Sequence, residues 1–219
     1  MIGGRFLAVM VLMACGDEQA FDSAGGFTDV STVWSQLETD PFADAVVSFL
    51  PGEVAGFGQD EMPEIVLGPP RGRGENAGSL DVVSFGRFGE LVVELADVAL
   101  VDGPGADLIV FENAFVGFTE PGEVSVSEDG LLWFSWPCAE EAPFHGCAGL
   151  NPVLANPVIN DIDPTDPAVA GGDVFDLAEL DGGASLTVRF VRLRDIGQGK
   201  YLGETGGFDL DGIAVVHSQ

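Results

Sequence analysis

Short apolar runs, separated by turns rich in glycine and proline, follow one another along most of this chain. The run at 123–127 alternates polar and apolar side chains, which is typical of a half-buried strand. No long stretch has the 3.6-residue apolar period of an amphipathic helix. The pattern predicts an all-β fold, a single antiparallel β-sandwich of jelly-roll type with long irregular loops. We expect strands at 43–49, 65–67, 81–85, 90–95, 107–111, 123–127, 131–136, 174–177, 184–193 and 208–216.

Two tight turns predict hairpins within this series of strands. The residues 86–89, Gly-Arg-Phe-Gly, should join the strands 81–85 and 90–95. Glu128-Asp129-Gly130 should turn the chain between 123–127 and 131–136. The proline- and Asn/Asp-rich stretch 151–169 predicts a long irregular excursion, and a short helix is expected to end at Leu180.

The N-terminal residues have the pattern of an export signal. Arg5 is a positive start, 6–13 is a short apolar run, and Ala14 is small. The residues 12–15, Leu-Met-Ala-Cys, resemble a bacterial lipobox, in which the cysteine is lipidated. We therefore expect a signal peptide at 1–14, a lipidated Cys15 with a polar tether at 15–40, and the sandwich at 41–219. The protein would be exported and membrane-anchored by lipid; the alternative is a secreted protein with a free Cys15.

Two further cysteines, Cys138 and Cys147, lie close together in the sequence. In an oxidising compartment, a disulfide between them is the expected outcome. His145 lies between them, which leaves a zinc site as an alternative, although no fourth ligand is evident.

The charge of the chain excludes some partners. Its 219 residues carry 36 Asp and Glu against 8 Lys and Arg, a formal net charge of -28. No basic patch for nucleic acid can be built from so few cations, and attraction to anionic lipid head groups is equally disfavoured. We expect a monomer.

Acidic and amide side chains cluster at the ends of apolar strands, where bare carboxylates are costly. The stretch 101–115, VDGPGADLIVFENAF, and the stretch 206–212, GGFDLDG, both show this pattern. Carboxylate and amide oxygens are the ligands that Ca²⁺ prefers. The alternative is that Arg189 or Arg192 neutralises the acids. The expected calcium ligands are Asp107, Glu112, Asn113, Asp173, Asp176, Asp209 and Asp211.

The spacing of the last pair predicts its orientation. In a strand, residues i and i+2 face the same side, so Asp209 and Asp211 should point away from Phe208 and Leu210. If their strand neighbours the one that ends at Glu112, these carboxylates could meet. The residues 160–166, NDIDPTD, lack the glycine and terminal glutamate of an EF-hand loop.

Several motifs resemble those of bacterial cell surface protein and lipoprotein domains. They include DGPGADLIVFENAF (102–115), GGDVFDL (171–177) and GFDLDGIAVV (207–216). More distantly, VSVSEDGLLWF (124–134) and VRFVRL (188–193) resemble galactose-binding-like (discoidin) β-sandwich domains. The resemblance implies a surface location and a β-sandwich. The long insert between Pro137 and Asp173 departs from the discoidin pattern, so a discoidin sugar pocket does not carry over.

These features favour a non-catalytic binding or adhesion domain, with a glycan or a surface protein as the partner. Aromatic side chains in loops stack on sugars, and arginines hold carboxylate ligands. One alternative is a hydrolase in which Glu112 and Asp209 act as acid and base on a glycoside. No G-x-S-x-G or H-E-x-x-H motif is present, which disfavours other hydrolases. A purely structural envelope protein is a further alternative. The candidate ligand-binding residues are Arg71, Arg73, Trp136 and Tyr201.

Overall fold

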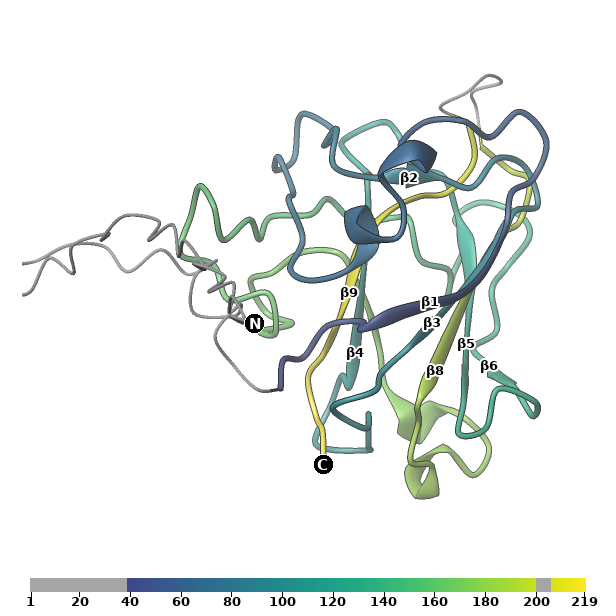
Figure 1. The fold of residues 1–219 in the computed structure, drawn as a ribbon, viewed down its shortest axis with the longest axis vertical. Coiled ribbons are helices and arrows are strands. Elements are labelled where there is room, and N and C mark those ends of the chain that lie inside the picture. The colour runs from purple at the N-terminus through teal and green to yellow at the C-terminus, as the bar shows by residue number, and fades with distance from the viewer. Residues whose placement is uncertain (1–38, 200–205) are drawn as a thin grey trace, which may run out of the picture.

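A computed structural model describes residues 39–199 and 206–219 of the chain. The predicted signal peptide, Cys15 and Tyr201 lie outside these ranges. Strands form two antiparallel sheets that pack face to face (Figure 1). The all-β sandwich expected from the sequence is confirmed. Within the described residues, no helix has the length and apolarity needed to cross a bilayer.

The five-stranded sheet has the order β1-β3-β8-β5-β6. All of its neighbouring strands are antiparallel. Ser125 of β5 pairs with Ser135 of β6, which confirms the predicted hairpin around Glu128–Gly130. The strands are β1 (Ala45–Leu50), β3 (Glu90–Glu94), β8 (Phe190–Asp195), β5 (Gly122–Ser127) and β6 (Phe134–Ser135).

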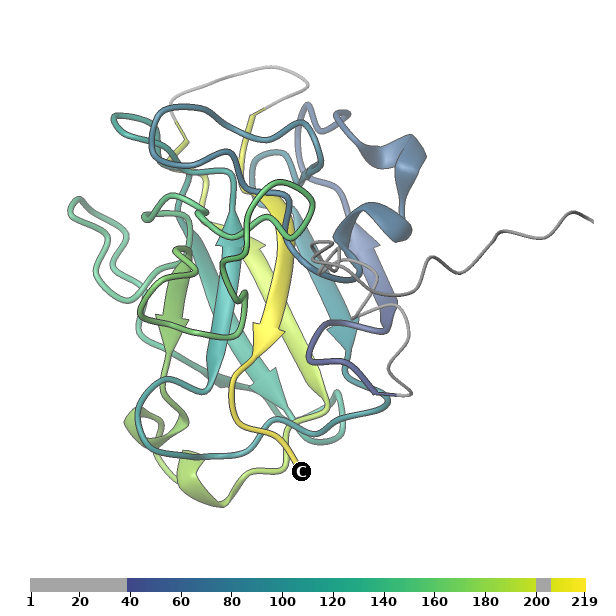
Figure 2. The ribbon, with the colours of Figure 1, turned by 90° about the vertical axis from the view of Figure 1, so that its left-hand side faces the viewer.

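The four-stranded sheet has the order β2-β9-β4-β7, and Figure 2 looks onto it, with β9 in yellow. Its central pair, β4 and β9, is antiparallel, with a register shift between Phe111 and Glu112. The start of β9 therefore lies beside the end of β4. The strands are β2 (Val83–Ser84), β9 (Asp209–Val215), β4 (Leu108–Glu112) and β7 (Asp173–Phe175).

Some predicted elements are wrong. The strands predicted at 81–85 and 90–95 form no hairpin, because β2 pairs with β9 while β3 pairs with β1 and β8 in the other sheet. Gly86 and Phe88 both have positive φ, and this turn carries the chain from one sheet to the other. Short 3-10 helices replace the strand predicted at 65–67 and the start of the one predicted at 184–193. They are η2 (Glu64–Val66) and η4 (Gly183–Ser185), and η1 (Gln59–Glu61) is a similar turn. The short helix expected to end at Leu180 is present as η3 (Leu177–Glu179), with Leu180 as its C-cap.

The main core lies between the sheets, as alternation requires. Leu108 and Val110 of β4 point into it, together with Phe208, Leu210 and Ile213 at and within β9. The alternate residues of the same strands, such as Ile109, Phe111 and Ala214, form a smaller core on the other face. There they pack against Phe42 and the irregular excursion, through Val153, Ala155 and Ala170. Both faces of the β4–β9 pair are therefore buried, and polar groups at its ends are buried with it.

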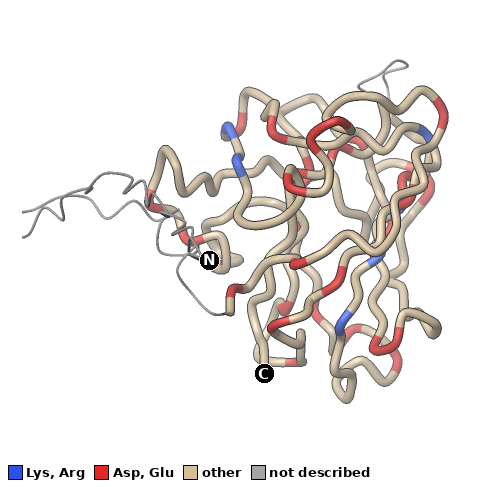
Figure 3. The backbone as a smooth tube through the Cα atoms, viewed as in Figure 1, with Lys and Arg blue, Asp and Glu red and all other residues tan. Residues whose placement is uncertain are grey.

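Acidic residues are spread over the described chain, and the few arginines lie scattered among them (Figure 3). Only one ion pair between an arginine and an acid is present in the described ranges, Arg71 with Asp81.

Candidate functional site

One group of buried acids lies where β4 ends and β9 begins. Glu112 is the last residue of β4, and Leu210 of β9 is its register partner. The backbone N–H of Asp209 donates to Glu112 Oε1 (3.3 Å), and the N–H of Asn113 donates to the Asp209 carbonyl (3.0 Å). Glu112, Asn113 and Asp209 thus meet, as the sequence predicted from their positions at the ends of apolar strands.

Glu120, in the loop before β5, joins this group. The N–H of Gly207 donates to Glu120 Oε1 (3.1 Å). Between the two donors, the N–H of Phe208 donates to Asp195 Oδ2 (3.0 Å). Three consecutive backbone N–H groups at the start of β9 therefore each hold a buried carboxylate. We call Glu112, Glu120 and Asp209 the Glu112 cluster.

The protein leaves two carboxylate oxygens of this cluster without partners. Glu112 Oε2 and Glu120 Oε2 are buried and have no hydrogen-bond partner among residues 39–199 and 206–219, and both residues are 0% exposed. Asp209 differs, because Ser84 Oγ donates to its Oδ1 and Asn113 adds a side-chain hydrogen bond. An unpaired buried carboxylate oxygen is costly, so these two atoms require an explanation.

Burial is the largest cause of a raised pKa for each acid in the cluster, and the charges of neighbouring acids add to it. Burial, followed by the charges of Asp209 and Glu120, raises the pKa of Glu112 well above its usual range. Burial and the charge of Asp209 raise the pKa of Glu120 to about 8. Burial raises the pKa of Asp209 to about 7, although hydrogen bonds from Ser84 and Asn113 oppose this change.

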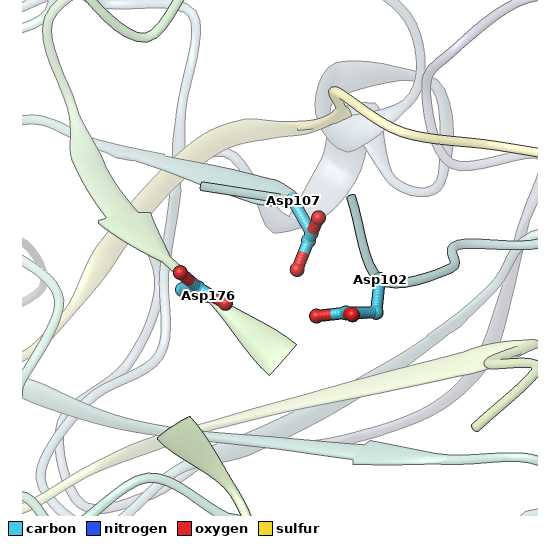
Figure 4. Close-up of side chains that lie close together, drawn as sticks. All are labelled: Asp102, Asp107 and Asp176. Atoms are coloured by element: carbon cyan, nitrogen blue, oxygen red, sulfur yellow. The ribbon is translucent and has the colours of Figure 1, made fainter. Parts of the chain in front are cut away.

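A second acidic group lies at the other end of β4. Carboxylate oxygens of Asp102, Asp107 and Asp176 lie within 4.8 Å of one another, and the three side chains point toward a common centre (Figure 4). We call this group the Asp107 triad. Three carboxylates at this separation could hold a metal ion.

Protein donors already occupy the buried member of the triad. Asp107 Oδ1 accepts from the Gly103 N–H (2.8 Å) and from His217 Nδ1 (2.8 Å), and Oδ2 accepts from the Leu177 N–H (2.8 Å). Asp176 Oδ1 caps η3 by accepting from the Ala178 N–H (2.8 Å). Only Asp102 has a buried oxygen, Oδ1, without a partner.

The predicted calcium ligands lie at several separate sites in the structure. Asp107 and Glu112 flank the same strand, about 17 Å apart at about 3.4 Å per residue, so they cannot share one ion. Asp173 accepts from the N–H groups of Gly149 and Leu150, away from Asp176. The expectation of a single site that includes both Asp107 and Glu112 is therefore wrong.

Asp211 is also buried, and both of its carboxylate oxygens accept from the Arg71 backbone N–H, at 2.8 and 3.0 Å. The Arg71 side chain instead lies 3.5 Å from Asp81, measured from Nε to Oδ2. Arg73 is exposed. The two arginines thus do not converge on a common ligand position, because Arg71 pairs with an acid of the protein itself.

Arg189 and Arg192 do not neutralise the Glu112 cluster. Arg189 Nη1 donates to the carbonyls of residues 95, 96 and 98, at 3.1 to 3.2 Å. The Arg192 guanidinium lies over the Trp133 ring at 4.5 Å and donates to Ser125 Oγ (3.3 Å). The contacts in the described ranges therefore give no support to the arginine alternative.

Cys138 and Cys147 form a disulfide, with their Cα atoms 4.6 Å apart, as predicted. The pairing leaves no thiolate for zinc, which removes the zinc alternative. A groove of about 640 Å³ lies beside the disulfide, and its lining includes His145, Asn151 and Glu179. Trp136 lines it too but is only 3% exposed, and its indole N–H donates to the Asp176 carbonyl (3.0 Å). Trp136 is therefore a wall of the groove, and the expectation of an exposed stacking surface is wrong.

Sequence reasoning missed Glu120, Asp195 and Asp102. Glu120 precedes Pro121 and a predicted strand, so the rule that selected Glu112, an acid beside an apolar strand, could have found it. Asp195 ends β8 and could have been found in the same way. Asp102 lies in a turn, where an acid usually indicates only turn chemistry.

Neither a scan against protein-family models nor a search of curated proteins finds a match to this chain. The resemblance to bacterial surface domains therefore stays a prediction from the motifs.

Proposed function

We propose that this chain is a non-catalytic binding domain of the cell envelope, which takes a small polar ligand such as a glycan in the groove beside the disulfide. The groove carries the proposal, because it is a concave surface of about 640 Å³ with polar groups at its wall. Ligand sites in proteins are typically concave, with a small number of placed polar groups.

The groove is firmly built. Asn151 Nδ2 donates to Asp173 Oδ1 (2.7 Å), and backbone N–H groups of residues 149–151 hold the other oxygen of Asp173. The Trp136 and Phe175 rings pack with their centroids 5.0 Å apart. Exposed His145 and Glu179 add hydrogen-bonding groups. These exposed polar groups at the groove wall suit a sugar, whose edges carry hydroxyl groups.

A location outside the cytoplasm is supported by the disulfide, since such bonds persist in oxidising compartments. The export signal at 1–14 and the lipobox-like Cys15 point the same way. We propose that Cys15 anchors the domain to a membrane by its lipid.

The rival hydrolase would use Glu112 and Asp209 as an acid–base pair. Their side chains are 0% and 5% exposed, so a glycoside cannot reach them without opening the fold. A purely structural envelope protein would have no use for the groove, and the experiment below separates that alternative from a binding domain.

The test is a glycan array probed with the mature protein, followed by titration of any glycan that is retained. We expect His145→Ala and Glu179→Ala to weaken binding about tenfold each, since each removes a polar group from the groove wall. The matched control is Glu141→Ala, an exposed glutamate of the disulfide loop outside the groove lining. Retention of no glycan, or binding that both groove variants leave unchanged, would overturn the proposal.

A further inference from the structure

The surroundings of the two unpartnered oxygens of the Glu112 cluster do not show how these buried oxygens are solvated. Glu112 and Glu120 are completely buried, and each has one oxygen hydrogen-bonded and the other without a partner. The hollow next to Glu112, between the Gly72–Ser79 loop and β9, is too small for a water molecule. At Glu120 the backbone packs directly on the carboxylate, because a Cβ on Gly199 would lie 2.6 Å from Oε1.

One short segment, residues 207–209, holds the carboxylates of Glu112 and Glu120 and therefore places them close together. Their donors, the N–H groups of Gly207 and Asp209, are two residues apart. Two residues span at most about 7 Å of chain. The charge of Glu120 also contributes to the raised pKa of Glu112, and the charge of Asp209 to that of both. Three acids therefore repel one another within a small buried volume.

No cation of the described chain offsets this repulsion. In residues 39–199 and 206–219, the ion pairs are Arg71 with Asp81 and His217 with Asp107. Neither involves a member of the Glu112 cluster. Buried carboxylates that are neither paired nor fully hydrogen-bonded destabilise a fold.

We propose that the Glu112 cluster is a calcium site, in which Glu112, Glu120 and Asp209 hold a single Ca²⁺. The ion would accept the unpartnered Oε2 atoms of both glutamates as ligands and would offset the repulsion among the three carboxylates. Asp209 is fixed by Ser84 and Asn113, so it presents its carboxylate in one orientation. Second carboxylate oxygens and backbone carbonyl oxygens would complete the six to eight ligands that Ca²⁺ takes.

The donor set selects Ca²⁺ over other common ions. All three side chains offer oxygen only, whereas Zn²⁺ in proteins favours cysteine and histidine. Cys138 and Cys147 are bonded to each other, His145 lines the groove, and His217 contacts Asp107 at the other end of β4. Mg²⁺ requires near-ideal octahedral geometry at about 2.1 Å and keeps several waters, which a dry, irregular cluster does not provide.

The side chains must move to close around the ion. Within the described residues, the Asp107 triad is the group whose three acidic oxygens lie within 4.8 Å of one another, so the oxygens of the Glu112 cluster are farther apart. Rotation about the glutamate side-chain bonds can bring Glu112 Oε2 and Glu120 Oε2 toward Asp209, since neither atom has a partner to lose.

The experiment measures the melting temperature of the full mature chain in EDTA and in millimolar Ca²⁺, together with the number of ions bound by equilibrium dialysis. At about 100 times the dissociation constant, we expect Ca²⁺ to raise the melting temperature by about 5–10 °C. Glu112→Gln and Glu120→Gln should each remove this shift and one bound ion. Millimolar Mg²⁺ should give a much smaller shift.

Two controls keep the test specific. Asp102→Asn alters the Asp107 triad, and Glu64→Gln removes one charge from an exposed position on η2. Both variants should keep the full calcium shift. The proposal is overturned if Ca²⁺ does not shift the wild type, or if Asp102→Asn removes the shift while Glu112→Gln keeps it. Variants that fail to fold are replaced by Ser84→Ala, which loosens Asp209 and should lower the apparent calcium affinity severalfold; an unchanged affinity counts against the site.

Discussion

The two ends of β4 bury similar acids in opposite ways. Asp107 and Glu112 are both 0% exposed, and each flanks or ends the same apolar strand. Three donors of the protein meet the two oxygens of Asp107. Glu112 receives a single long hydrogen bond, and its second oxygen has no partner. Burial of a carboxylate therefore does not by itself determine whether the protein supplies hydrogen-bond donors to both of its oxygens.

The difference has a local cause at each end. Near Asp107, the turn at Gly103, the start of η3 at Leu177 and the C-terminal His217 all direct donors at one side chain. Near Glu112, the register shift after Phe111 and the glycine-rich loop that lines the same small hollow direct no second donor of the described residues at its carboxylate. Both oxygens of Asp107 are hydrogen-bonded within the protein, whereas only one oxygen of Glu112 is.

The largest loss of stability should come from removing Asp107, the acid whose two oxygens are both hydrogen-bonded. Asp107→Ala leaves the N–H groups of Gly103 and Leu177 and the His217 ring without an acceptor, next to a small cavity. We expect a loss of about 3–5 kcal/mol in the free energy of unfolding. Urea denaturation in EDTA and in Ca²⁺ measures it, and the loss should be the same in both. A loss below about 1 kcal/mol would show that the network contributes little.

A smaller effect of the same sign should follow from His217→Ala. This change removes one of the three donors and leaves both backbone N–H groups in place. Hydrogen bonds to charged groups contribute about 1.5–3 kcal/mol, and the ring is 30% exposed, so we expect a loss near about 1.5 kcal/mol. In the double variant with Asp107→Ala, the cost of His217→Ala should largely vanish. Additive losses would mean that the two side chains do not act together.

At the Glu112 end, replacing the acid by its amide should not lower the free energy of unfolding when calcium is absent. Glu112→Gln in EDTA removes a carboxyl group whose ionisation burial and the charges of Asp209 and Glu120 disfavour, so we expect the free energy of unfolding to stay level or rise by about 1 kcal/mol. The matched change Asp107→Asn should lower it, because an amide nitrogen would face a donor. Chemical denaturation of both variants in EDTA makes this comparison. A larger loss in the free energy of unfolding for Glu112→Gln than for Asp107→Asn in EDTA would contradict the difference between the two ends of β4.

Local patterns predicted a large part of the fold. Alternation in 123–127 and the Glu128–Gly130 turn gave the β5–β6 hairpin, because its contacts are close in sequence. The hairpin predicted around the turn at 86–89 does not form, because the residues of a turn do not determine whether the next strand joins the same sheet. The 3-10 turn of η4 shortened β8 for a similar reason: apolar residues at 184–193 fit either conformation until packing decides.

The same limit applies to the candidate site. The positions of Glu112, Asn113 and Asp209 followed from strand ends that the sequence displays, and the structure brings them together. Glu120 and Asp102 lie in loops whose places depend on distant segments, such as Gly207 for Glu120. The hydrogen-bond donors that occupy Asp107 also come from far along the chain, so the sequence could not show that this acid is satisfied.

The smallest effect should come from Arg71→Ala, although Arg71 lies against a buried acid of the Glu112 end. The Arg71 backbone N–H, which alanine keeps, is the group that donates to both oxygens of Asp211. The guanidinium lies 3.5 Å from Asp81, with the two side chains 38% and 45% exposed, and such surface pairs contribute little. We therefore expect a loss of about 0.5 kcal/mol or less in urea denaturation, close to that of Arg73→Ala at an exposed position. A loss above about 1.5 kcal/mol would mean that the Arg71 side chain, rather than its backbone N–H, compensates the charge of Asp211. The Glu112 end would then receive more positive charge from the protein than its hydrogen bonds indicate.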